Sequence, residues 1–338
     1  MVQYLVKRIA LFVLTLFLIT ILTFAISRMA PGDPAQLKVG IGAEGSLAGS
    51  RELNEKMIEM IRKQWHLDEP LWKQYWLWLQ DLASLEFGKS FQDNRPVVDK
   101  ILERVPVTLS MNVLSVIIAY LIAIPLGIYS ATHPNTLWDR ISTFVLFALY
   151  SLPTFWVGTM AITFLCNPEF LAIFPTGGLR SINFSEQWPL LRKILDYAWH
   201  LTLPMLVYTY GSFAFISRQM RSAMLETIRQ DYIRTAYAKG LDSRTVIYKH
   251  ALRNSLIPII TLLAGVFPML VGGSVIIETI FSIPGMGELS FRALVARDYP
   301  VIMAVFTISA FLTLFGILVA DILYSIVDPR IAFGKKTA

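Results

Sequence analysis

Six apolar runs, each long enough to cross a bilayer, constrain the fold of this chain more than any other feature. One crossing takes roughly 20 residues of helix. The runs lie at residues 9–26, 107–131, 141–165, 199–217, 256–277 and 301–327. Charged residues make up only 16% of the chain, against about 25% in soluble domains. The sequence therefore predicts an all-α polytopic membrane protein with six transmembrane helices.

The first run follows Lys7 and Arg8, as the apolar core of a signal peptide would. Its length of 18 residues exceeds the roughly 7–15 residues that are usual for such a core, and no A-x-A cleavage site follows. We therefore expect it to be retained as a first transmembrane helix.

The distribution of Lys and Arg predicts the orientation, because cytoplasmic loops of membrane proteins carry an excess of cations. With both termini in the cytoplasm, fourteen cations near the membrane lie inside and five lie in the two short outer loops. The outer segment 30–106 adds ten cations, but twelve acids match them, and the segment is longer than the range over which the rule holds. This loop bias also accounts for the net charge of +6, and we expect no nucleic-acid partner.

Three regions follow along the chain: an N-terminal transmembrane helix at 1–29, an extracytoplasmic region at 30–106, and a core at 107–338 that holds the cytoplasmic loop 218–255. Apolar residues at helical spacing predict two short amphipathic helices in the outer region, one before and one after Pro70. Indole is favoured at the headgroup level of a bilayer. The outer tryptophans thus fit a membrane-facing position, packing against the transmembrane helices, or a docking surface for an external partner.

Several kinds of chemistry have no marker in the sequence. Cys166 is the only cysteine, and the four histidines show no ligand spacing. FGKS at 87–90 lacks the earlier glycine of a phosphate-binding loop, because Ala83 stands there. No HExxH or G-x-S-x-G motif is present. We therefore expect no catalytic residue, metal or cofactor.

The middle of each predicted span lacks charged residues, which disfavours a proton-driven or sodium-driven carrier. Glu278 and Asp321 are expected close to the interfaces, and Arg297 and Asp298 as a solvated pair. Proline and glycine interrupt most of the spans, as is common in transport proteins. Uphill transport by this chain would need energy from another subunit.

The stretch RTAYAKGLDSRTVIYKHALRN, residues 234–254, carries the clearest local signals. Gly240 suits a left-handed helix end, and Asp242 or Ser243 suits the cap of a second helix. The cations at 234, 239, 244 and 249 recur every five residues, a net step of about 140° on a helix, so they do not form a single lipid-binding stripe. Small residues beside the turn favour insertion of this angled projection into a cleft on another protein.

This stretch resembles the cytoplasmic EAA loop of ABC-importer permeases of the dipeptide and oligopeptide branch. The general pattern opens with Glu and has Pro thirteen residues after the Gly. Arg234 and Arg253 occupy those positions here, as in the peptide branch. Further segments resemble that branch in the same order: PGDP (31–34), WHLDEPLWKQY (65–75), ILERVPVTLSM (101–111), ETIFSIPGMGEL (278–289), RDYPV (297–301) and DILYSIVDPRI (321–331).

The resemblance implies a type I ABC-importer permease fold in a prokaryotic cytoplasmic membrane. It implies a second, related permease, two ATPase subunits, an extracytoplasmic binding protein and a peptide substrate. The loop would couple the ATPase to the path through Arg234, Thr235, Ala236, Ala238, Lys239, Gly240 and Leu241. Its supporting residues would be Asp242, His250, Arg253 and Asn254.

Other readings remain open at this point. Instead of an importer subunit, the chain could be a stand-alone channel, a secondary carrier or a membrane hydrolase. Nickel, glutathione or oligosaccharides are alternative substrates of the same importer architecture. Gly285 and Gly287 fit close packing of an outer turn or a gate, and the segment 328–330 fits a structured end of the last helix.

Overall fold

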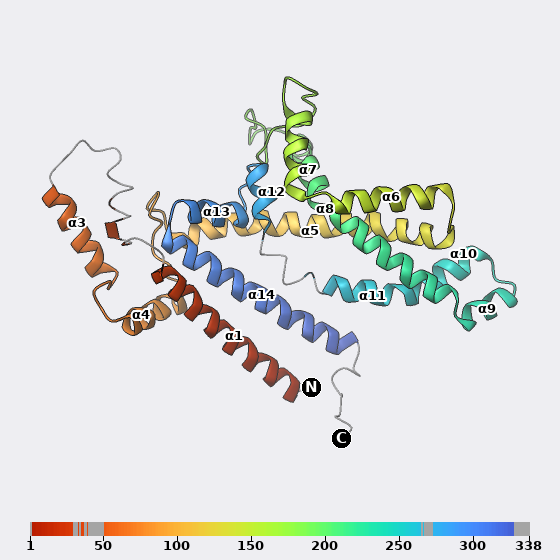
Figure 1. Ribbon diagram of the computed structural model, residues 1–338, viewed down its shortest axis with the longest axis horizontal. Helices are drawn as coiled ribbons and strands as arrows, with labels where there is room; N and C mark the ends of the chain where they lie inside the picture. Colours follow the sequence, from red (N-terminus) through yellow and green to blue (C-terminus); the bar gives the residue numbers. More distant parts are fainter. Residues whose placement is uncertain are drawn as a thin grey trace.

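A computed structural model describes residues 2–29, 33, 35–36, 39, 51–264, 266 and 273–327. Helices dominate this part of the chain (Figure 1). The helices of the first half are α1 (Val2–Met29), α3 (Arg51–Gln64), α4 (Leu71–Ala83), α5 (Val97–Thr132), α6 (Leu137–Ser151), α7 (Thr154–Ala161) and the π-helix η1 (Ile162–Cys166). Those of the second half are α8 (Leu190–Ile228), α9 (Asp231–Ala238), α10 (Ser243–Thr245), the π-helix η2 (Val246–Ala251), α11 (Leu252–Ala264), α12 (Val275–Ile280), α13 (Met286–Val295) and α14 (Tyr299–Val327).

The first and last long helices, α1 and α14, pack side by side and run in opposite directions (Figure 1). Arg8 near the start of α1 forms an ion pair of 2.9 Å with Asp321 near the end of α14. Phe12 and Phe311 meet edge to face, with ring centroids 5.7 Å apart. The start of α1 and the end of α14 therefore lie at the same end of the pair, as an even number of crossings requires.

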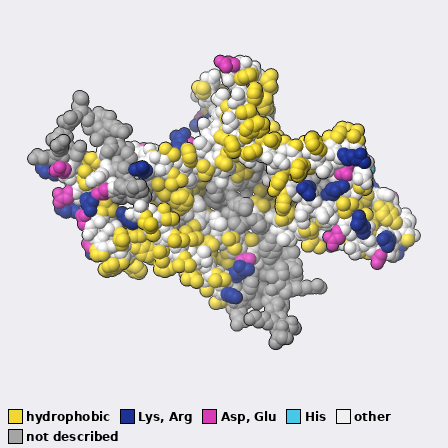
Figure 2. Space-filling view, viewed as in Figure 1, with side chains coloured by type: hydrophobic (Ala, Val, Ile, Leu, Met, Phe, Trp, Pro, Cys, Tyr) yellow, Lys and Arg dark blue, Asp and Glu magenta, His cyan; other side chains and the backbone are white. Residues whose placement is uncertain are grey.

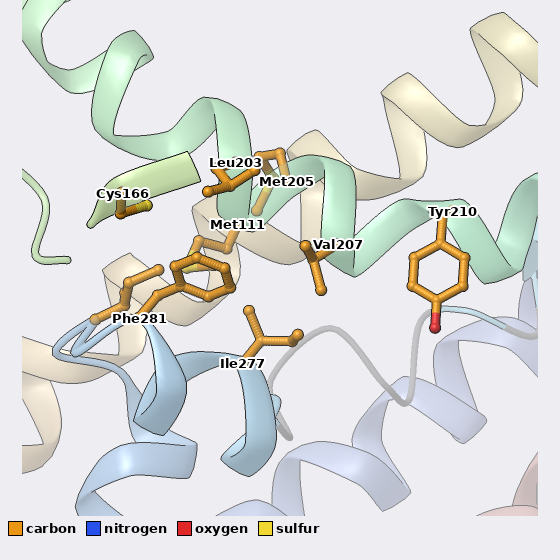
Figure 3. Packing of buried hydrophobic residues seen from close by; sticks show 9 residues of the cluster. Met111, Cys166, Leu203, Met205, Val207, Tyr210, Ile277 and Phe281 are labelled. Carbon is orange, nitrogen blue, oxygen red and sulfur yellow. The ribbon is translucent and has the colours of Figure 1, made fainter. Parts of the chain in front are cut away.

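Helices α5 and α8 form the centre of the molecule and pack closely against each other. A Cβ atom at Gly127 of α5 would lie only 2.6 Å from Cβ of Met220 and 2.7 Å from the carbonyl oxygen of Ser217. Glycine is thus needed there for space. At the other end of the two helices, Met111 and Leu203 enter an apolar cluster with Cys166 and Phe281 (Figure 3).

The prolines inside α5 and α8 do not end these helices. Helix α5 already begins at Val97, ten residues before the predicted span, and continues through Pro106 and Pro125. Helix α8 likewise continues through Pro204. Neighbouring helices can compensate for the hydrogen bond that a proline removes, so these prolines are not the breaks that the sequence suggested.

The predicted span 141–165 is not one straight helix. Helices α6 and α7 meet at an angle of 97°. Leu152 and Pro153 between them are extended, with ψ angles of 131° and 134°. A residue before proline is pushed out of the helical region, and proline cannot donate the next helical hydrogen bond. SLP at 151–153 therefore ends one helix and starts another.

The predicted span 256–277 is also divided, because α11 and α12 are separate helices and Ser274 between them is extended. Within the described residues, three helices are long and apolar enough to cross a membrane, namely α1, α5 and α14, and the bent pair α6–α7 makes up to four. Helix α8 contains the predicted span 199–217. The segment 328–330 lies outside the described residues.

The segment 30–106 contains α3 and α4, which confirms the two helices predicted around Pro70. Trp65 stacks on Phe91 with ring centroids 4.7 Å apart, and the hydroxyl of Tyr75 lies 2.9 Å from that of Thr20 on α1. Trp72 and Trp76 remain 73% and 57% exposed. Helix α4 is thus fixed to α1 on one side and presents indole rings on another.

Asp298, expected as a solvated side chain, is instead buried with 2% exposure. It accepts hydrogen bonds from the hydroxyl of Ser90 and from the amide of Phe91, the latter at 3.0 Å. The carboxylate therefore joins the turn between α13 and α14 to the outer segment. Ser90, the last residue of the FGKS sequence, therefore has a structural role as a hydrogen-bond donor to Asp298.

Glu278, expected close to an interface, is buried inside the protein with 1% exposure. It accepts hydrogen bonds from the hydroxyl of Thr108 at 3.1 Å and from the amide of Glu288 at 2.9 Å. A Cβ atom at Gly285 would lie 2.4 Å from its carboxyl carbon. The glycines of SIPGMGEL thus allow the chain to close around this carboxylate.

Candidate functional site

The 234–254 stretch forms a projection at one end of the molecule, opposite the end that carries α3 (Figure 1). Helix α8 extends to Ile228, and α9, α10 and η2 follow it. Charged side chains gather at this end and near α3, with apolar side chains over the surface between them (Figure 2). The helix–turn–helix predicted from the sequence is confirmed.

The turn after α9 depends on Gly240, which has a φ of +79°. The amide of Gly240 donates to the carbonyl of Tyr237 at 2.9 Å, and the amide of Leu241 donates to that of Ala236 at 3.4 Å. These two bonds form a Schellman motif, in which a left-handed residue reverses the chain at a helix end. No atom lies within 4 Å of a Cβ atom built at Gly240, so the backbone angle alone requires glycine.

The next helix begins with Asp242 as its N-cap. Its carboxylate accepts a hydrogen bond of 3.0 Å from the amide of Thr245. Hydrogen bonds from the side chain and the amide of Thr245 hold the pKa of Asp242 below its ordinary value. Asp242 is therefore ionised at neutral pH, and the charged form suits the positive end of a helix.

The inner face of the projection packs on the end of α8. Ile233 and Val246 are 1% and 0% exposed and contact the same apolar cluster as Met220 and Met224. Ala236 also belongs to this cluster, with 7% exposure. Its side chain thus faces the end of α8, whereas the side chains of its neighbours on α9 face outward.

The outer face carries the remaining residues of the predicted coupling set. Six of them are exposed: Arg234, Thr235, Ala238, Lys239, Gly240 and Leu241. Tyr237 and Tyr248 are also exposed, at 43% and 57%, and sequence reasoning did not single them out. The apolar positions 233, 236 and 246 mark the buried face of the projection, and this pattern could have indicated that the two tyrosines lie on the other face.

Two contacts fix the projection to the residues that follow it. Asn254 donates a hydrogen bond of 2.7 Å to the hydroxyl of Tyr232, which brings a predicted supporting residue onto α9. Ser255, which was not predicted, donates to the carbonyls of Ala251 and Ala223 at 2.9 and 3.3 Å. Among the other supporting residues, His250 is half-buried and Arg253 is exposed.

A charged cluster lies where α6 meets α8, on the same part of α8 that carries the projection. Asp139 is buried with 4% exposure and forms an ion pair of 3.1 Å with Arg221. It also accepts hydrogen bonds from the hydroxyl of Ser130 and, at 3.0 Å, from the amide of Asn135. This cluster ties α8 to the α5–α6 turn and was not predicted.

Across the described ranges, no group of three or more His, Cys, Asp or Glu side chains could hold a metal ion. The projection is an exposed surface with a capped helix start beside the helical core.

The fold is that of the transmembrane subunit of a type I ABC importer. The fold matches the inward-facing conformations of the MetNI methionine ABC transporter with a TM-score of 0.52, covering 68% of this chain and 96% of that chain. Sequence identity is 18%, so this likeness concerns the fold.

The chain belongs to the family of binding-protein-dependent transport system inner membrane components, whose model matches residues 123–333. The N-terminal model of the same systems matches residues 1–112. Similar proteins include the oligopeptide transport system permease protein AppB of Bacillus subtilis, 39% identical over 98% of this chain and 100% of the relative. The dipeptide transport system permease protein DppB of Alkalihalophilus pseudofirmus is 35% identical over 98% and 100%. The inner membrane ABC transporter permease protein YejB of Escherichia coli O157:H7 is 32% identical over 98% and 99%.

Proposed function

We propose that this chain forms half of the translocation path of an ATP-driven importer for dipeptides or oligopeptides. It has no catalytic role of its own. Two separate ATPase subunits drive it, a related second permease completes the path, and an extracytoplasmic binding protein delivers the peptide. The observation that carries the proposal is the full-length similarity to oligopeptide and dipeptide permeases.

The proposal places the chain in a prokaryotic cytoplasmic membrane with both termini inside. The antiparallel α1–α14 pair, with Arg8 beside Asp321, supports termini on one side. The excess of cations in the projection supports the cytoplasm as that side. The surface at Thr235, Ala238, Lys239 and Leu241 would then face the ATPase.

Uptake by vesicles that contain the reconstituted complex tests the function. We expect peptide accumulation that requires ATP and the binding protein, and none when the ATPase subunits are omitted. Transport without any ATPase would establish a channel or secondary carrier instead. Competition by nickel, glutathione or an oligosaccharide, with no competition by peptides, would refute the peptide substrate.

Disulfide crosslinking tests the coupling surface, and two alanines of α9 supply a matched pair. Ala238 is exposed, whereas Ala236 is buried. In a background without Cys166, Ala238→Cys should crosslink to a cysteine in the ATPase groove and Ala236→Cys should not. No crosslink from Ala238→Cys in an ATP-hydrolysing complex would contradict this contact.

A further inference from the structure

A groove with a volume of about 700 Å³ runs between α5, α8 and α11. Its lining includes the polar side chains Asn112, Ser115, Tyr208, Ser212 and Thr261. All of them lie within the spans 107–131, 199–217 and 256–277 that the sequence predicts. Polar groups are costly against lipid tails and usually face the inside of a bundle or a water-filled cavity.

The floor of the groove is a hydrogen-bonded pair of side chains from two helices. The hydroxyl of Tyr208 on α8 donates to the side-chain carbonyl of Asn112 on α5. Asn112 and Ser115 are 5% and 7% exposed, so they lie beneath the wall residues. The floor is therefore polar and fixed by side chains of the same chain.

The wall of the groove continues along α8 as a single stripe. Tyr208, Ser212, Phe215, Gln219 and Ser222 follow one another at intervals of four, three, four and three residues, which places them on one helix face. Phe215 borders both this groove and a second one of about 360 Å³ that Gln219 and Ser222 line. The two grooves together extend toward the end of α8 that carries the projection.

We infer that this α8 stripe, with the Asn112–Tyr208 floor, is this chain's share of the translocation path, and that Phe215 forms an aromatic constriction in it. The inference rests on the proposed function, because a second permease must close the open side. The described lining of the larger groove carries no charged side chain. Arg218 lines the second groove. In the larger groove, neutral hydroxyl and amide groups suit the uncharged amide groups of a peptide backbone.

The helix itself supplies a matched control for this inference. Phe215 and Leu206 are equally exposed in this chain, at 52% and 50%. They are nine residues apart, which is about 900° on an α-helix and therefore half a turn net. If the stripe borders water and the opposite face borders lipid, cysteines at the two positions will differ in chemical reactivity although their exposure is the same.

The experiment uses the assembled transporter in lipid vesicles and a charged, water-soluble methanethiosulfonate reagent. The native Cys166, which is buried, is replaced by Ala, and Phe215→Cys, Ser212→Cys and Leu206→Cys are introduced singly. A thiol must ionise to react, and an apolar surrounding disfavours ionisation. We expect both stripe cysteines to react at least roughly tenfold faster than Leu206→Cys. The second stripe position keeps the test valid if Phe215→Cys does not assemble.

Two outcomes would overturn the inference. If neither stripe cysteine reacts, this face of α8 has no contact with water and packs against lipid or against the second permease. If Leu206→Cys reacts as fast as the stripe cysteines, the stripe contacts water no more than the opposite face of α8 does, and the inference is refuted. Labelling does not require transport, so it tests the path independently of the substrate. If the expected labelling pattern is found but peptides do not compete for uptake, the path is supported and only the peptide substrate is refuted.

Discussion

Two glycine-containing turns of this protein use glycine for opposite reasons. At Gly285 the chain closes on the buried Glu278, and an added Cβ would lie 2.4 Å from the carboxyl group. At Gly240 no atom lies within 4 Å of such a Cβ, but φ is +79°. The first turn thus needs space and the second needs a backbone angle. The crowded turn belongs to the packed core, whereas the open turn lies on the exposed surface of the projection.

The largest effect is expected from Gly285→Ala. The new methyl group would overlap a carboxylate that Thr108 and the amides of Ser274 and Glu288 hold in place. Overpacking typically costs about 1–3 kcal/mol, and we expect the upper part of this range because several bonds would have to shift. Thermal unfolding of the purified complex, followed by tryptophan fluorescence, measures the loss.

Gly211→Ala is the control for this substitution. Gly211 lies inside α8 and has no atom within 4 Å of an added Cβ, so alanine should leave the unfolding temperature unchanged or raise it slightly. Equal losses at Gly211 and Gly285 would show that crowding around Glu278 is not the cause.

A smaller effect is expected from Gly240→Ala, because only the left-handed angle is disfavoured. The cost should be about 1 kcal/mol, with ATP hydrolysis less tightly coupled to uptake. Asn tolerates the left-handed region better than Ala, so Gly240→Asn should restore part of the stability. If Gly240→Asn is stable but still uncoupled, the side chain itself obstructs the contact; if both variants couple normally, the turn geometry is not needed.

The same two turns show why one could be predicted from the sequence and the other could not. Gly240 and Asp242 bond to residues that lie no more than five positions away, so short-range signals were sufficient. Glu278 bonds to Thr108, 170 residues earlier, and Asp298 to Ser90, 208 residues earlier. Nothing beside either acid in the sequence indicates such a partner, so the burial of Glu278 was not predicted and Asp298 was wrongly expected to be solvated.

The prolines show the same difference between local sequence signals and contacts with distant residues. Pro153 ends a helix together with Leu152, but Pro106, Pro125 and Pro204 lie inside continuous helices. A proline always removes one hydrogen bond, whereas packing by neighbouring helices decides whether the helix continues. The presence of long apolar helices could be predicted, but their breaks depend on this tertiary packing. For the same reason, burial of Ala236 was beyond a sequence-based prediction.

Asp242→Ala should lower stability less than Gly240→Ala, because the N-cap is exposed to water. The lowered pKa of Asp242 fixes the sign of its pH dependence. Its stabilisation is fully present above the unfolded pKa of about 3.9 and is lost as pH falls through the lower folded value. At pH 7, Asp242→Asn should preserve most of the cap; equal losses for Asn and Ala would contradict a capping role.

The smallest effect on stability is expected from Arg234→Ala. Its ion pair with Asp231 spans 3.6 Å between side chains that are 75% and 96% exposed, so its loss should change the free energy of unfolding by less than about 0.5 kcal/mol. Coupling should still suffer if this cation contacts the ATPase, and Arg234→Lys should then restore uptake in vesicles at low salt. Arg234→Ala should therefore change transport with almost no change in stability, whereas Gly285→Ala in the crowded turn should lower stability. Normal uptake by Arg234→Ala at physiological salt would remove Arg234 from the contact surface and leave that role to Thr235, Ala238, Lys239 and Leu241.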